Sequence, residues 1–87
     1  MPEYLLELYV ARADAVAVEQ GAARVRRAAE EYSREGTPVR YLRSIFVPDD
    51  ETCFLIFEAP SVEAVREVAQ RAAVSFEHVA AAIETAS

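Results

Sequence analysis

Hydrophobic residues recur along the chain with two different periods. From residue 3 to residue 10 the period is two, which predicts a strand with one apolar face. The apolar face carries Tyr4, Leu6, Leu8 and Val10, and the other face carries Glu3, Leu5, Glu7 and Tyr9. From residue 15 to residue 35 the apolar positions follow the period of an amphipathic helix. Asp14 is the predicted N-cap of this helix, and Gly21 interrupts it at a cost of about 1 kcal/mol relative to alanine. The alternative is that the helix breaks or starts late in the Gly21 region.

Residues 36–60 predict a β-hairpin between two stop signals. Two runs rich in aromatic and β-branched residues are joined by the turn-forming segment 48–51 and flanked by Gly36 and Pro60. Pairing about this turn puts Leu42, Ser44, Phe46, Cys53, Leu55 and Phe57 on one face and Tyr41, Arg43, Ile45, Phe54, Ile56 and Glu58 on the other. The first face is almost entirely apolar, and the second mixes large apolar groups with charge.

A second helix begins after the hairpin, with Ser61 as the predicted N-cap and a buried stripe that starts at Val62. Residues 76–87 are ambiguous by composition, since Val79 to Ile83 suits a helix or a strand. Topology favours a strand, because without it one edge of the first strand stays unpaired. In that strand Val79, Ala81 and Ile83 are expected to face inward, with His78, Ala80 and Ala82 on the other face.

These elements predict an α+β ferredoxin-like βαββαβ fold in one domain, residues 1–87, with both helices on one face of a four-stranded antiparallel sheet. The opposite face carries Leu5, Tyr9, Ile45, Phe54 and Ile56, which is too apolar for water on a domain this small. We therefore expect the chain to form a homodimer through the open sheet faces.

The composition argues against nucleic acid and membranes as binding partners. The net charge is -6, with 15 acidic residues against 9 arginines and no lysine, which argues against nucleic acid. No run approaches the roughly 20 apolar residues of a membrane span. Cys53 is the single cysteine and no signal peptide is recognisable, so a cytoplasmic location is expected.

The chain lacks a phosphate loop, a CxxC or HExxH motif and a nucleophile signature. The candidate functional residues are therefore the polar side chains on the open face of the sheet. Glu7, Glu58 and His78 offer carboxylate and imidazole groups, which suit a divalent transition metal. The alternative pairs Arg43 with Glu7 or Glu58 as an ion pair and leaves His78 merely exposed. The acidic segment 49–51 is read as a solvated turn rather than a cation site, and Cys53 as a small buried hydrophobe.

Segments 36–42, 46–54 and 57–61, together with Glu7, resemble a small bacterial nickel-binding, ferredoxin-like domain family. The resemblance covers nearly the whole chain and is densest from Gly36 to Arg66. It implies a ferredoxin-like subunit that dimerises through its sheets and binds nickel on the sheet surface. Glu7, Cys53, Glu58 and the following Ala59-Pro60 match the family by position.

Three alternative functions follow, and the first two belong to different classes. The first is a non-enzymatic nickel-binding homodimer whose metal ligands are Glu7, Glu58 and His78, with no catalytic residues. The second is a small-molecule binder or enzyme of the dimeric α/β-barrel type, with an apolar cavity lined by Tyr41 and Phe54. In that second case His78, Tyr41 and Glu58 transfer protons. A structural dimer without a ligand is the third alternative.

Overall fold

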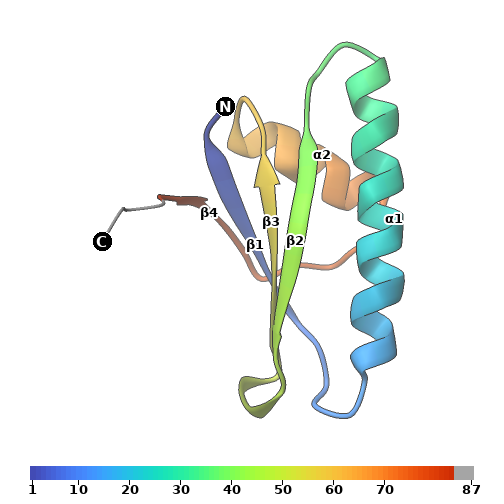
Figure 1. Cartoon of the computed structure of the whole chain (residues 1–87), viewed down its shortest axis with the longest axis vertical. Coiled ribbons are helices and arrows are strands. Elements are labelled where there is room, and N and C mark those ends of the chain that lie inside the picture. Colours follow the sequence, from blue (N-terminus) through green and yellow to red (C-terminus); the bar gives the residue numbers. More distant parts are fainter. Residues whose placement is uncertain (84–87) are drawn as a thin grey trace.

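The computed structural model describes residues 1–83, which form a β-sheet and two helices in the order β-α-β-β-α-β (Figure 1). The elements are β1 (Glu3–Tyr9), α1 (Ala15–Arg34), β2 (Arg40–Val47), a 3-10 turn η1 (Pro48–Asp50), β3 (Thr52–Glu58), α2 (Val62–Arg71) and β4 (His78–Ala82). The four strands pair antiparallel in the order β2-β3-β1-β4. The predicted α+β architecture is confirmed.

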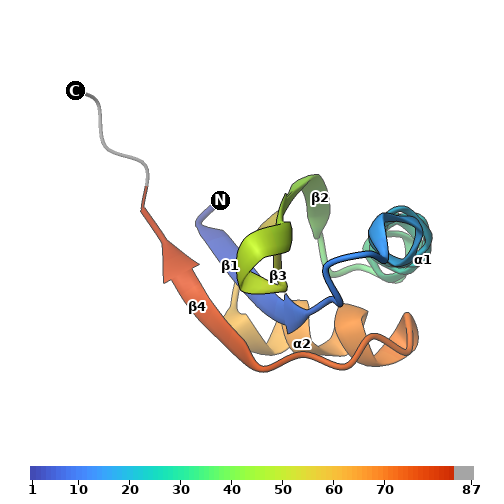
Figure 2. The same cartoon turned by 90° about the horizontal axis from the view of Figure 1, so that it is seen from below.

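Both helices lie on one side of the sheet, α2 under its centre and α1 toward the β2 edge (Figure 2). Side chains at alternate strand positions face these helices and form the core, because burying one face of each strand removes the most apolar area from water. Its largest fully buried members are Phe57, Leu6, Leu55, Val25, Val65, Val68 and Cys53. The burial predicted for Cys53 is confirmed.

The helix ends follow the capping residues seen in the sequence. The Asp14 carboxylate accepts a hydrogen bond from the Ala17 amide at 3.2 Å, and the Ser61 hydroxyl accepts one from Ala64 at 3.2 Å. Gly21 does not break α1, which runs without interruption from Ala15. The second helix ends without glycine, and Ala73 takes the left-handed conformation there with φ 55.

A β-bulge in β2 changes the predicted faces at its first residues. Tyr41 pairs with Phe57 whereas Arg43 pairs with Ile56, so Leu42 is the extra residue. Tyr41 therefore faces the helices and meets the Phe57 ring edge-on at 5.8 Å. The open-face position predicted for Tyr41 is wrong, because strict alternation does not hold across a bulge. Leu42, predicted to face inward, is half-buried and has no register partner on β3.

The last segment is a strand, as topology required. Its residue Val79 pairs with Leu6 and is buried on the helix side, while His78 and Ala80 lie on the other face. Ile83 follows the end of β4 and is 85% exposed, so its predicted inward position is wrong. In the described chain, neither α1 nor α2 combines the length and apolar character that crossing a membrane requires.

Arg71 ties α2 to the end of α1. Its two terminal nitrogens donate to the Glu35 carboxylate at 2.7 Å each, and its Nε donates to Glu67 at 2.9 Å. The guanidinium also lies 4.6 Å from the centre of the Tyr32 ring. The hydrogen bonds from Arg71 lower the pKa of Glu35 below its ordinary value of 4.5.

This ion pair predicts a pH-dependent stability difference. Because folding lowers the pKa of Glu35, its contribution is present above the unfolded value and is lost as the pH falls through the folded value. The melting temperature of Glu35→Gln should therefore lie below that of the parent at neutral pH, and the two should converge in acid. Glu31→Gln is the matched control, since Glu31 lies 3.7 Å from Arg71 and should show a smaller difference. A Glu35→Gln difference that is constant with pH contradicts this assignment.

Candidate metal centre

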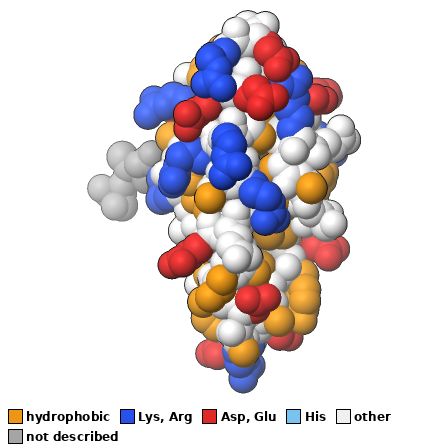
Figure 3. Space-filling view, turned by 90° about the vertical axis from the view of Figure 1, so that its right-hand side faces the viewer, with side chains coloured by type: hydrophobic (Ala, Val, Ile, Leu, Met, Phe, Trp, Pro, Cys, Tyr) orange, Lys and Arg blue, Asp and Glu red, His pale blue; other side chains and the backbone are white. Residues whose placement is uncertain are grey.

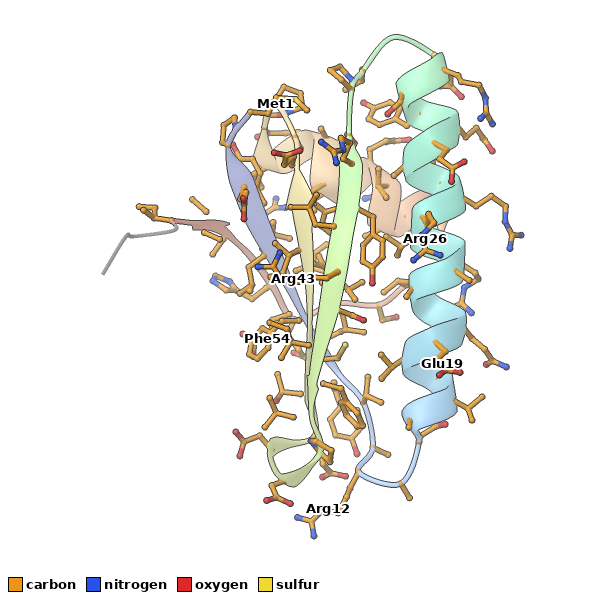
Figure 4. All side chains as sticks on the ribbon, in the orientation of Figure 1. Met1, Arg12, Glu19, Arg26, Arg43 and Phe54 are labelled. Carbon is orange, nitrogen blue, oxygen red and sulfur yellow. The ribbon has the colours of Figure 1, made fainter. Side chains whose placement is uncertain are left out.

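The open face, the side of the sheet away from the helices, displays side chains from all four strands. Figure 4 shows Arg43 and Phe54 projecting from the side of the sheet opposite α1. The strand register arranges these side chains in rows across the sheet. The first row is Arg40, Glu58, Glu3 and Ala82, the second Arg43, Ile56, Leu5 and Ala80, and the third Ile45, Phe54, Glu7 and His78.

Glu7 and His78 are direct neighbours in the third row. They are register partners of the β1·β4 ladder and both lie on the open face. Side chains at opposed antiparallel positions have Cβ atoms roughly 5 Å apart, within reach of one ion. The Glu77 amide donates to the Glu7 carbonyl at 2.8 Å, which holds the beginning of β4 against β1. Carboxylate and imidazole at this spacing suit a divalent transition metal.

Glu58 lies at the other end of the face. It shares a row with Glu3, four residues from Glu7, so the two rows are about 13 Å apart along the strands. Its carboxylate accepts a hydrogen bond from Arg40 at 2.9 Å. In the alternative weighed from the sequence, Arg43 was the cation expected beside Glu7 or Glu58; Glu58 instead pairs with Arg40.

The sequence does not predict that Arg40 lies on the open face beside Glu58, because the bulge at Leu42 reverses the faces of the residues that precede it. Strict alternation places Arg40 on the same face as Leu42 and Phe46, the face expected to be dry. A charged residue such as Arg40 at a position predicted to face the core is a signal in the sequence that the strand is irregular there.

A single subunit brings together two of the three proposed ligands. Between residues 1 and 83, the structure contains no group of three or more histidine, cysteine, aspartate or glutamate side chains arranged to hold a metal. The donor pair of Glu7 and His78 therefore fits nickel as part of a site, with further ligands required from elsewhere.

The other acidic and thiol groups have structural surroundings. In the turn after β2, the Glu51 carboxylate accepts hydrogen bonds from the Arg12 amide at 3.0 Å and from the Tyr9 hydroxyl at 3.4 Å. These contacts fix the β1–α1 connection to the hairpin turn. Cys53 is fully buried on the helix side, and burial raises the pKa of its thiol, which disfavours the thiolate that binds metals.

The apolar groups on the open face differ in exposure. Tyr9 is 62% and Ile45 is 46% exposed, whereas Ile56 is 5% exposed because its neighbours already cover it. Leu5 and Phe54 are half-buried. Apolar side chains thus remain available for a partner around the row that holds Glu7 and His78.

Comparisons with known proteins agree with this architecture. The family described as "Nickel responsive protein SCO4226-like" matches residues 4–81. The crystal structure of SCO4226 from Streptomyces coelicolor A3(2) superposes with a TM-score of 0.75 at 20% sequence identity, covering 97% of this chain and 99% of that chain. No curated protein sequence matches the chain. At this identity the structural likeness supports the fold.

Proposed function

Because the chain belongs to the SCO4226-like family of nickel-responsive proteins, we propose that it is a non-enzymatic nickel-binding homodimer. The observation that carries the proposal is the direct opposition of Glu7 and His78 on the open face. An imidazole nitrogen and a carboxylate oxygen are ligands that nickel accepts. His78 is exposed and Glu7 is half-buried beside it, so both side chains are accessible to an ion.

The second subunit is the proposed source of the remaining ligand, Glu58. The first and third rows lie on either side of the row of Leu5 and Ile56. If two copies stack face to face about a two-fold axis along that middle row, the first row of one copy lies over the third row of the other. Glu58 of one subunit then approaches Glu7 and His78 of its neighbour. Packed sheets are about 10 Å apart, a gap that two long side chains can span.

Nickel should raise the melting temperature of chelator-stripped protein. A ligand at 100 times its dissociation constant stabilises the folded state by about 2.7 kcal/mol, which corresponds to roughly 10 to 20 °C for a domain of this size. His78→Ala and Glu7→Gln should each abolish most of the shift. Glu19→Gln is the matched control, because Glu19 is an exposed carboxylate on α1, on the other side of the sheet from the open face. If nickel leaves the melting temperature of the parent protein unchanged, the proposal is excluded.

Mixed dimers test whether Glu58 acts across the interface. His78→Ala and Glu58→Gln homodimers should both bind nickel weakly. When the two variants are unfolded together and refolded, each mixed dimer regains one intact site, because one subunit keeps Glu7 and His78 and the other keeps Glu58. If mixing restores no binding, Glu58 does not act across the interface, and Glu58→Gln homodimers that bind nickel as tightly as the parent show that Glu58 is not a ligand.

A further inference from the structure

A cavity of about 210 Å³ lies between the first half of α1 and the end of the sheet near Tyr9, the last residue of β1. Helix α1 contributes three small residues, Ala17, Gly21 and Ala22, besides Val18 and Arg24, and the sheet contributes Leu8 and Leu55. Helix α2 ends at Arg71, so only the residues after it reach this end of the sheet. Small side chains on one wall and a short second helix together leave the space unfilled.

Gly21 keeps this cavity open. A Cβ atom built at Gly21 meets nothing within 4 Å, so a side chain here has room. Glycine lowers the stability of a helix interior relative to alanine, and Gly21 occupies no turn or left-handed position that requires it. The residue therefore reduces helix stability without a conformational reason, and its structural effect is empty volume.

Arg24 supplies the only charge among the described residues that line the cavity. It lies one helical turn after Gly21, and its Nε donates to the Ala72 carbonyl at 3.0 Å, which fixes the guanidinium near the cavity. Both terminal nitrogens of a guanidinium anchored through Nε remain available to a carboxylate. Arginines gather on this side of the molecule, over the upper part of α1 in Figure 3, while hydrophobic side chains are prominent lower down.

We propose that this cavity binds a small hydrophobic carboxylate, with its apolar body against Leu8, Val18 and Leu55 and its carboxylate on Arg24. The size fits, since a cavity of about 150 Å³ accepts a benzene ring and this one is larger. The chemistry of the lining fits as well. The apolar part of the ligand is removed from water when it binds, and the carboxylate of the ligand pairs with the positive charge of Arg24. The sequence predicts an apolar cavity at Tyr41 and Phe54, and neither residue lines this one.

The test is a titration of chelator-treated protein with sodium benzoate and with toluene, followed by amide chemical shifts. Chelator keeps nickel out, so the result is independent of the proposed metal site. We expect saturable benzoate binding in the millimolar range or tighter, with the largest shifts at Gly21, Ala22 and Cys53. Benzoate should bind at least tenfold more tightly than toluene.

Four variants separate the contributions of space and charge. Gly21→Leu should fill the cavity and abolish binding, whereas Gly21→Ala adds one methyl group and should retain it. Arg24→Gln should weaken benzoate at least tenfold, and Arg27→Gln is the charge-matched control because Arg27 does not line the cavity. Circular dichroism confirms that each variant is folded, and the arginine pair gives a second test if Gly21→Leu does not fold.

Three results overturn the proposal. The first is the absence of saturable benzoate shifts in the parent protein. The second is an equal loss in Arg24→Gln and Arg27→Gln, which indicates a general charge effect. The third is toluene binding as tight as benzoate binding, which removes the role of Arg24.

Discussion

Replacing Phe57 with alanine is expected to lower the free energy of unfolding by about 3–5 kcal/mol, a large part of the roughly 5–15 kcal/mol that stabilises a typical domain. Phe57 is fully buried at the centre of the sheet, where it pairs with Tyr4 on β1 and meets the ring of Tyr41 edge-on. Alanine leaves a cavity that neighbours on two strands cannot close. Urea denaturation at a fixed protein concentration measures the loss.

Phe57→Leu is the control for this substitution. It retains most of the side-chain volume and should cost under about 1.5 kcal/mol. A loss below 1 kcal/mol for Phe57→Ala is inconsistent with a core centred on Phe57, because the surrounding strands would then have to collapse onto the vacated space.

Replacing Ile45 with arginine should weaken the proposed dimer by roughly 100-fold or more, since an unpaired charge buried at an interface costs about 3–5 kcal/mol. Ile45 is 46% exposed in the subunit, so the fold itself tolerates a charge there. In a face-to-face dimer it lies in the row of Glu7 and His78. Sedimentation equilibrium across a range of concentrations measures the change.

Val16→Arg is the matched control for the interface. Val16 is 60% exposed on α1, away from the open face, so the same added charge should leave the dimer constant unchanged. A parent protein that remains monomeric at micromolar concentration contradicts the dimer, and so does equal dissociation of both variants. Loss of nickel binding in Ile45→Arg, with Glu7 and His78 intact, links the metal site to the dimer.

Much of the fold was predictable because local chemistry and topology agree. Asp14 and Ser61 mark helix starts by their capping side chains, and the segment from Pro48 to Glu51 forms the predicted turn. The last strand is ambiguous by propensity, and only the need to pair the free edge of β1 predicts it. The bulge at Leu42 was not predictable from alternation, since one extra residue reverses every face on one side of it.

The candidate site was predictable only in part, because it depends on register as well as on faces. Alternation placed Glu7, Glu58 and His78 on one face, and the register shows that Glu7 and His78 share a row while Glu58 lies about 13 Å along the strands. Sequence alone gives no measure of this separation. The cavity beside Gly21 was not visible either, since empty volume depends on how α1 packs on the sheet.

The most direct test of the central claim is isothermal titration of the chelator-stripped protein with nickel, accompanied by light scattering to determine its mass. The account predicts a dimer that binds one nickel ion per subunit at saturation, with the heat lost in His78→Ala and retained in Glu19→Gln, which changes an exposed residue of α1. A flat titration, or binding that His78→Ala leaves unchanged, contradicts a nickel site at Glu7 and His78.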